Sequence, residues 1–441
     1  MKYDFDPKKV CKCGKIHKTA LESCIIESGA ISRLPEYLKS YGVSKAFIIS
    51  DVNTYPIAGE KVFKVLSESG FECKTHTYPD RRLEPNEYAV GSLVMSFDAT
   101  CDVIIGVGSG VINDISKILA NVSHCPYVIV ATAAYMDGYA SGTSSMALNG
   151  VKVTVPAKSP NIIIGDTDVL CGAPIHMAKA GLGDMLAKYV SICEWRLSNL
   201  INGEYYCEDV AEYTRRSLRE CVETAEGLLE RDENAMKALF AGLINAGKAM
   251  DYAGVSRPGG GVEHYFSHIW DMRGLDMGTP VSSHGVQCAL GTLYSIKCYR
   301  ALCEITPDRE KALAHARSFD LAAWNEELRA FVGKGAEAMI ALEEKEKKYD
   351  LQKHEKRLEV ILANWDKIVE IINDELPTVE EFEAILDRIA APKSISEIGM
   401  DESILPMTLK CTKDIRDKYV LPRLLWDLGV TDEICEKVFT K

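Results

Sequence analysis

Three histidines lie close together in the second half of this sequence, and imidazole is a common metal ligand and proton carrier. His264 and His268 are four residues apart in "GVEHYFSHIWDM", and His284 follows shortly after. Side chains four apart share one face of a helix, so His264 and His268 can face the same cleft. The alternative for each is a hydrogen-bonded core histidine. The pattern is not the zinc-protease motif, because Glu263 precedes His264 instead of following it.

A carboxylate with a suitable setting precedes these histidines in the chain. "GLGDMLAK" places Asp184 at a predicted helix N-terminus, directly after Gly181 and Gly183, and "SSHGVQCALG" places His284 at the start of another apolar helix. Two imidazoles and one carboxylate are a suitable ligand set for a divalent metal with an open position, as in catalytic zinc sites. Spacing alone leaves open whether these residues converge.

A glycine-rich loop is the second feature of the sequence that could serve a chemical function. "DVIIGVGSGVINDISKILA" places Gly106, Gly108 and Gly110 between a strand and a helix, where N–H groups can hold a pyrophosphate. It differs from the common dinucleotide fingerprint because Val111 stands at the third glycine position, and a simple tight turn is the alternative. Asp51 ends the strand "AFIIS" and can accept hydrogen bonds from both ribose hydroxyls, which favours NAD over NADP; turn capping is its alternative.

The segments around this loop indicate an α/β domain. Apolar runs of strand length alternate with amphipathic segments, which predicts a parallel sheet covered by helices on both faces. We expect a β-hairpin over residues 144–160, with Asn149-Gly150 as its turn. The predicted strands are 45–50, 71–78, 102–108 and 127–133, and the predicted helices between them are 57–69, 86–97 and 111–122.

After about residue 170 helical periodicity prevails to the C-terminus. Residues 181–195 carry apolar side chains at helical spacing, and Thr378 with Glu381 has capping-box spacing at the start of another helix. We therefore predict a Rossmann-like nucleotide-binding domain over residues 1–170 and an all-α, metal-binding and catalytic domain over residues 171–441.

Composition limits the partners of this chain of 441 residues. With 51 basic and 64 acidic residues the net charge is −13, which opposes nucleic-acid binding and leaves small phosphates held in a local pocket. No signal-peptide core or membrane-spanning apolar run is present, so we expect a cytoplasmic protein whose 15 scattered cysteines are reduced. Cys11, Cys13 and His17 suggest a zinc clip, but without a visible fourth ligand a packed N-terminal turn is preferred.

A family resemblance connects these features. The ordered motifs "GVGSGVINDISK", "ATAAYMDGYAS", "NGVKVTV", "GLGDMLAK", "RPGGGVEHYFSHIWDM" and "SHGVQCALGTL" resemble those of glycerol-1-phosphate dehydrogenases, especially the bacterial form associated with arabinose operons. The superfamily also contains glycerol dehydrogenase, dehydroquinate synthase and the iron-dependent alcohol dehydrogenases. The resemblance runs over nearly the whole chain and implies a dehydroquinate synthase-like fold.

The resemblance also implies roles for individual residues. It implies that Asp184, His264 and His284 bind the metal, with Asp184 also counted as catalytic, and that His268 and Asp137 contact the substrate. Lys188 stands where iron alcohol dehydrogenases have a fourth ligand, so zinc or nickel is expected rather than iron. The implied cofactor residues are Asp51, Gly108, Ser109, Gly110, Val111, Ile112, Asn113, Asp114, Thr132, Tyr135 and Ser141; among them Tyr135 departs from an expected serine.

The activity that the resemblance implies is a reversible, metal-dependent reduction of dihydroxyacetone phosphate by NADH or NADPH to sn-glycerol 1-phosphate. It also implies a homodimer that acts in phospholipid metabolism. Three alternatives are a dehydrogenase for an unphosphorylated polyol such as glycerol, a dehydroquinate-synthase-like lyase, and a cofactor-binding protein without catalysis. Asp184 counts against the lyase, because dehydroquinate synthases have glutamate there. Candidate cations for the substrate phosphate are Lys152, Lys158, Lys188 and Arg257.

Overall fold

The computed structural model describes residues 4–148 and 151–440. The chain divides into two compact units. The first comprises Met1–Met185 and Asp209–Val255, and the second comprises Leu186–Glu208 and Ser256–Lys441. By this division the helices of residues 209–255 group with the sheet, whereas the predicted boundary after residue 170 separates them from it. That boundary stays a prediction about functional domains.

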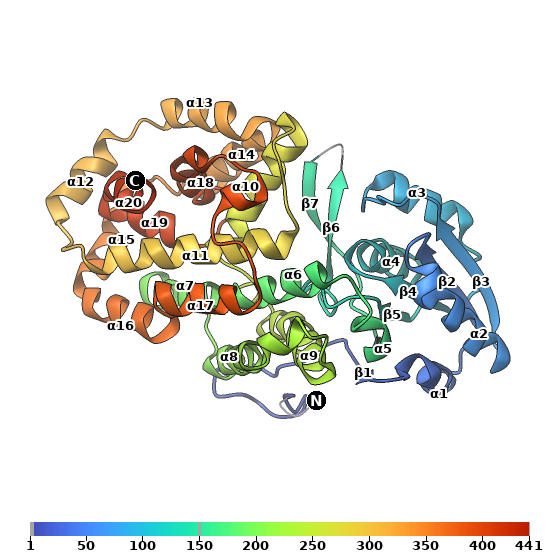
Figure 1. Cartoon of the computed structure of the whole chain (residues 1–441). Coiled ribbons are helices and arrows are strands. Elements are labelled where there is room, and N and C mark those ends of the chain that lie inside the picture. Colours follow the sequence, from blue (N-terminus) through green and yellow to red (C-terminus); the bar gives the residue numbers. More distant parts are fainter. Residues whose placement is uncertain (1–3, 149–150, 441) are drawn as a thin grey trace. The chain divides into compact units, whose positions relative to one another are not determined.

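A six-stranded parallel sheet forms the centre of the first unit (Figure 1). Its strand order is β1-β8-β5-β4-β2-β3. The strands are β1 (Ser23–Glu27), β2 (Lys45–Asp51), β3 (Glu72–Tyr78), β4 (Val103–Gly108), β5 (Tyr127–Ala131) and β8 (Ile162–Asp166). The predicted parallel sheet is confirmed, but the sequence prediction missed β1 and β8. Both are strands of five residues, too short for a clear periodicity.

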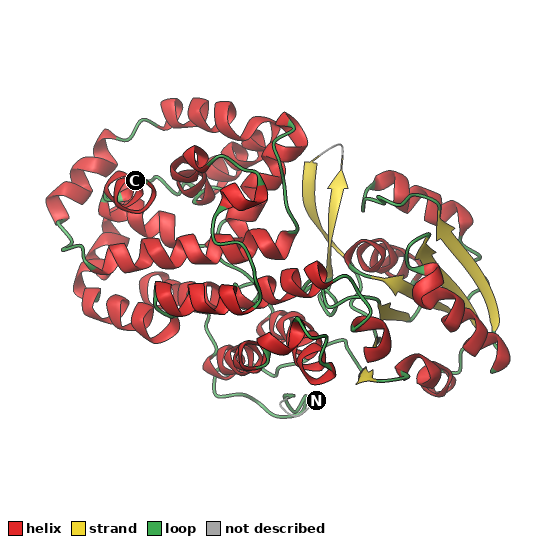
Figure 2. Cartoon of the chain, viewed as in Figure 1, coloured by secondary structure: helices red, strands yellow, loops and turns green. Residues whose placement is uncertain are grey.

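Helices cover both faces of this sheet (Figure 2). They include α1 (Leu34–Ser40), α2 (Glu60–Glu68), α3 (Glu87–Ser96) and α4 (Gly110–Ser123). Alternate strand residues such as Ile48 and Ile105 belong to one core cluster with Leu38 of α1 and Leu66 of α2. On the opposite face Phe47 packs edge-on against Phe97, which follows α3, at 5.2 Å between ring centroids. The period-two pattern of the strands thus separates two apolar layers.

The remaining strands of the first unit form a separate antiparallel hairpin, β6 (Thr143–Leu148) and β7 (Val151–Pro156), which confirms that prediction. Its predicted turn, Asn149-Gly150, lies outside the described residues. Further helices of this part of the chain are α5 (Thr167–Leu170), α6 (Ile175–Leu186), α8 (Glu208–Glu223) and α9 (Glu233–Ala253). The predicted helix 181–195 is wrong as one element, because α6 ends at Leu186 and α7 (Lys188–Asn202) begins at Lys188.

The described part of the second unit is helical. The predicted capping box is confirmed, since the Thr378 hydroxyl accepts the Glu381 N–H at 3.1 Å and the Glu381 carboxylate accepts the Thr378 N–H at 2.8 Å. Besides α7, the helices are α10 (Val262–Met277), α11 (His284–Cys303), α12 (Arg309–Ser318), α13 (Leu321–Val332), α14 (Ala336–Glu346), α15 (Leu351–Ala363), α16 (Trp365–Glu375), α17 (Val379–Arg388), α18 (Leu405–Thr412), α19 (Leu421–Leu428) and α20 (Thr431–Phe439). Among the described residues no helix is long and apolar enough to span a bilayer.

Candidate active site

The order of the strands identifies a ligand-binding edge of the sheet. From β2 the chain crosses to the edge strand β3, whereas from β4 it crosses in the other direction to β5. The neighbouring strands β2 and β4 therefore flank a topological switch point, where open α/β sheets bind ligands at the carboxyl ends of the strands. Asp51 ends β2 and Gly108 ends β4. The two features predicted to hold a dinucleotide thus lie at the carboxyl ends of neighbouring strands.

The glycine loop makes a tight connection between β4 and α4. A Cβ atom at Gly108 would lie 2.6 Å from the side chain of Ile112, so only glycine allows this close approach. Ile112 is buried, and the side chain of Asn113 is held by the Tyr127 hydroxyl and by the carbonyl of Gly138. These two side chains therefore pack inside the protein, and the groups of this loop expected to bind an anion are the backbone N–H groups of the first turn of α4.

Asp51 caps a turn. Its Oδ1 accepts the N–H groups of Asn53 at 2.7 Å and Thr54 at 2.8 Å, and the Thr54 hydroxyl accepts the N–H of Asp51. The capping alternative considered from the sequence is therefore present. A carboxylate has two oxygens and about four lone-pair sites, so while Oδ1 caps the turn, Oδ2 can accept a hydrogen bond from a ribose hydroxyl.

A buried lysine that sequence reasoning missed holds the loop between β5 and β6. Lys117, at the end of the "GVINDISK" motif, is fully buried and donates to the Ser141 hydroxyl and the Thr143 carbonyl, both at 3.1 Å, and to the Gly138 carbonyl. Burial lowers the pKa of Lys117 to about 8. A hydrogen bond from the Thr132 N–H to the Gly108 carbonyl connects the same loop to the glycine loop. The structure therefore brings Thr132 and Ser141 together with the glycine loop, and Tyr135 lies between them on the same loop.

Asp184 is fixed against this loop within the first unit. It is fully buried in the last turn of α6, so its predicted place at a helix N-terminus is wrong. Its Oδ2 accepts the backbone N–H of Asp137 at 2.8 Å. The helix approaches the loop closely at Gly181, where a Cβ would lie 2.2 Å from the Ala134 carbonyl oxygen. The structure thus joins two predicted site residues, Asp137 and Asp184.

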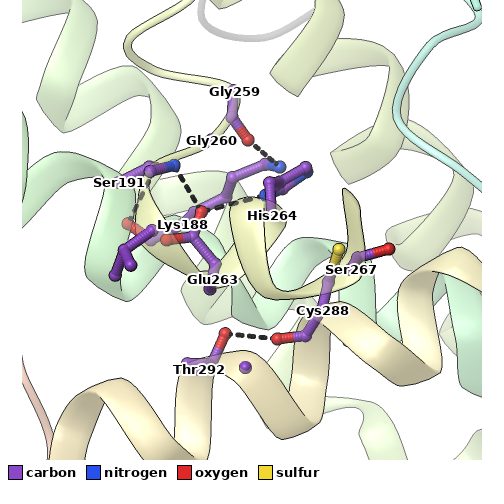
Figure 3. A network of polar contacts seen from close by, with 12 residues as sticks. Lys188, Ser191, Gly259, Gly260, Glu263, His264, Ser267, Cys288 and Thr292 are labelled. Carbon is purple, nitrogen blue, oxygen red and sulfur yellow. Dashed lines mark hydrogen bonds and ion pairs between the residues drawn. The ribbon is translucent and has the colours of Figure 1, made fainter. Parts of the chain in front are cut away.

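The three predicted histidines converge in the second unit, where α10 packs along α11. The rings of His264 and His284 have their centroids 5.2 Å apart, and His268 stacks on His284 at 6.0 Å. Cys288 of α11 joins them, with its Sγ 3.5 Å from His284 Nε2 and its sulfur pointing toward α10 (Figure 3). Ligand atoms of His264, His284 and Cys288 lie within 4.8 Å of one another. The sequence analysis missed Cys288, although Cys288 follows His284 by four residues, the same spacing as that between His264 and His268.

Hydrogen bonds fix the orientation of the imidazoles of His264 and His284. The Glu263 carboxylate lies 2.9 Å from His264 Nδ1 and can only accept, so Nδ1 carries the proton and Nε2 offers its lone pair. His284 Nδ1 lies 2.9 Å from the Ser267 hydroxyl. Second-layer partners of this kind fix metal-bound histidines. Burial raises the pKa of the Cys288 thiol, but the neighbouring His264 and His284 outweigh this effect, so that the pKa lies below its ordinary value. Two imidazoles beside a thiol form a donor set that fits a divalent metal such as zinc or nickel.

A second buried carboxylate supports the start of α10. Glu194 accepts the Val262 N–H at 2.9 Å and the Leu421 N–H at 2.7 Å. Burial, and the nearby carboxylate of Glu263, raise the pKa of Glu194 to about 8. Through these two hydrogen bonds Glu194 links the start of α10, the helix that carries His264, to Leu421 at the start of α19.

The candidate phosphate-binding cations are mostly engaged by the protein. Arg257 is buried and paired with Glu204, with 2.8 Å between its Nε and the carboxylate. Lys188 donates to the Gly259 carbonyl at 2.6 Å, and Lys158 donates to the Cys125 carbonyl at 2.6 Å. The side chain of Lys152 lies outside the described residues. The geometry therefore singles out none of the four.

Comparison with known proteins places the chain in a family. Residues 25–174 match the family of iron-containing alcohol dehydrogenases. A glycerol-1-phosphate dehydrogenase [NAD(P)+] of Halalkalibacterium halodurans is 32% identical over 294 residues, which are 66% of this chain and 74% of that protein. One from Geobacillus thermodenitrificans is 26% identical over 405 residues, 91% of each chain. The crystal structure of glycerol dehydrogenase from Schizosaccharomyces pombe has the same fold, with a TM-score of 0.61 at 17% identity over 99% of this chain and 93% of that one. This chain therefore belongs to the glycerol-1-phosphate dehydrogenase family.

Proposed function

We propose that this protein is a metal-dependent, NAD(P)-linked dehydrogenase that reversibly reduces dihydroxyacetone phosphate to sn-glycerol 1-phosphate. The observation that carries the proposal is the convergence of His264, His268 and His284 at the contact of α10 and α11. Relatives named glycerol-1-phosphate dehydrogenase [NAD(P)+] support the same reaction.

The cofactor belongs at the switch point of the sheet. The N-terminus of α4, from Gly110 on, binds the pyrophosphate, and the loop from Thr132 to Ser141 contacts the nicotinamide half. Asp51 binds the adenosine ribose through Oδ2 and repels a 2′-phosphate, so NAD is preferred over NADP. This preference is tested by comparing kcat/KM for NADH and NADPH in Asp51→Asn, which keeps the turn-capping oxygen and removes the charge.

Asp184, His264 and His284 are the proposed metal ligands, and Cys288 lies beside the two histidines. A metal and a nicotinamide bound in this way supply a Lewis acid for the ketone oxygen and a hydride donor for the carbonyl carbon. Glu263 holds His264 with its Nε2 lone pair presented, and Ser267 holds His284 in the same manner. The residues of this chain thereby fix the geometry before any ligand binds.

His268 and Asp137 handle the substrate. His268 is half-buried, lies one helical turn from His264 and stacks on His284, so it is placed to donate to a substrate hydroxyl and pass a proton toward solvent. Asp137 is half-buried, with its backbone held by Asp184, and its carboxylate orients a second hydroxyl.

The reverse reaction tests this function. The purified protein, supplied with zinc or nickel and NAD⁺, should oxidise sn-glycerol 1-phosphate far faster than sn-glycerol 3-phosphate or glycerol. Faster oxidation of glycerol would replace the proposal with a polyol dehydrogenase, the alternative favoured by the engagement of Arg257, Lys188 and Lys158 within the protein.

The family resemblance also supports a proposal about the cellular setting. We expect a cytoplasmic homodimer that supplies phospholipid metabolism with its product. Sedimentation equilibrium of the metal-loaded protein tests the dimer.

A further inference from the structure

A group of metal-binding side chains outside the candidate active site lies in the N-terminal segment. An antiparallel bridge joins Val10 to Ile16, and within it the Gly14 N–H donates to the Cys11 carbonyl at 2.9 Å. Gly14 has a φ of +85°, which a residue with a side chain rarely adopts, so glycine permits this tight hairpin. The hairpin brings Cys11 and Cys13 to one end of the loop. The whole segment runs beside α8 and α9 (Figure 1).

His17 presents one particular nitrogen to these cysteines. Its ring is buried, and Nδ1 lies 2.7 Å from the Tyr252 carbonyl. A carbonyl only accepts, so Nδ1 carries the proton and Nε2 keeps its lone pair. Nε2 lies 3.5 Å from Cys13 Sγ. This is the arrangement in which a protein holds a metal-binding histidine, with the far nitrogen fixed by a backbone carbonyl.

The two thiols and the imidazole are close enough to share one ion. Ligand atoms of Cys11, Cys13 and His17 lie within 4.8 Å of one another. Tetrahedral zinc, with metal–ligand bonds of about 2.0–2.3 Å, places its ligand atoms within such distances. A fourth donor would close the coordination shell.

Chain connectivity supplies that donor at Cys207. Cys11 Sγ lies 3.1 Å from the carboxylate of Asp209, which is two residues after Cys207 at the start of α8. Two residues span about 7 Å at most, so the Cys207 side chain is within reach of the hairpin. Cys207 is also buried, with 2% of its surface exposed. The sequence pattern concealed this residue because 190 positions separate it from the N-terminal motif.

We propose that Cys11, Cys13, His17 and Cys207 bind one structural zinc ion that fastens the N-terminal segment to the start of α8. Three thiolates and one imidazole select zinc over hard cations such as Mg²⁺, and four protein ligands leave no position for a substrate. Each cysteine binds as a thiolate, so binding releases the three thiol protons to solvent while the metal keeps its oxidation state. None of these residues takes part in the proposed dehydrogenase reaction.

The zinc content of the protein and its variants tests this site. After removal of loosely bound metal, His264→Ala should retain one tightly bound zinc per chain. Cys13→Ser and Cys207→Ser, in the same His264→Ala background, should lose it. Replacement of the zinc by cobalt in that background should give intense thiolate-to-cobalt charge-transfer absorption, and this absorption should be much weaker in both Cys13→Ser and Cys207→Ser. Cys171→Ser, at a half-buried cysteine outside the group, should keep the full zinc content and absorption.

Two results would overturn the proposal. One is unchanged zinc content and cobalt absorption in both Cys13→Ser and Cys207→Ser. The other is loss of zinc in Asp209→Asn with retention in Cys207→Ser, which would assign the fourth position to the carboxylate. If the cysteine variants do not fold, release of zinc from the folded His264→Ala protein by a mercurial thiol reagent decides the point. Absence of any thiol-releasable zinc there contradicts the site.

Discussion

The proposed cofactor region at the carboxyl end of the sheet consists mainly of backbone groups, whereas the proposed metal region on α10 and α11 consists of side chains. At the sheet, backbone groups form the site, and side chains such as Lys117 support the backbone from inside. On α10 and α11 the side chains themselves are the site, and His264 is held by Glu263. The difference teaches that the metal region should fail when one side chain is removed, whereas the cofactor region should fail when its backbone is displaced.

The largest effect is expected for His264→Ala. If His264 is a metal ligand, as proposed, its loss removes stabilisation of the developing oxyanion, so kcat/KM for ketone reduction should fall by about 10³-fold or more. Steady-state NADH oxidation and metal content measure this together. An active variant that retains the catalytic metal would end the role of His264 as a ligand, and unchanged NADH binding by fluorescence is the control.

A smaller loss is expected for Glu263→Gln, which tests the support of the metal region. The amide group keeps the size of the side chain but weakens its acceptance of the His264 Nδ1 proton, and changes of this type cost about 10–100-fold in metal affinity or activity. Titration with zinc, followed by activity, separates the two effects. Full activity recovered at higher zinc concentration fits a positioning residue, whereas unaltered zinc affinity contradicts this role.

Gly108→Ala tests the backbone character of the cofactor region. Its Cβ would lie 2.6 Å from Ile112, which forces the glycine loop to move, so the KM for NADH should rise by about tenfold with a stability loss of about 1–3 kcal/mol. Truncation of the neighbour in Gly108→Ala/Ile112→Ala makes room and should restore part of the affinity. A double variant no better than the single one would show that the close contact is not the cause.

The smallest effect concerns Lys117 and pH. Its folded pKa of about 8 lies below the ordinary value of 10.5, so between these pH values the unfolded chain binds more protons and stability rises with pH. The free energy of unfolding of Lys117→Met, measured with urea across this window, should rise less than that of the wild type. If the free energy of unfolding of the two proteins changes with pH in the same way, Lys117 does not cause the pH dependence of stability.

The same contrast explains what could be predicted from the sequence. The glycine loop, the strands around it and the Thr378 capping box are local patterns, and the structure confirms the predicted sheet and cap. Cys288 and Lys117 were missed because their roles depend on contacts across the fold. Strand β8 was missed too, although it pairs with both β1 and β5, because its run of three isoleucines, residues 162–164, fits a short strand and a buried helix turn equally well.

The most direct test of the proposed function is the rate of NADH oxidation by the zinc- or nickel-loaded protein on dihydroxyacetone phosphate and dihydroxyacetone at equal concentration. A strong preference for the phosphate ester, abolished in His264→Ala, is the predicted result. Equal rates, or a preference for the unphosphorylated ketone, would contradict the assignment and point to a polyol dehydrogenase, with Tyr135 the first residue to test.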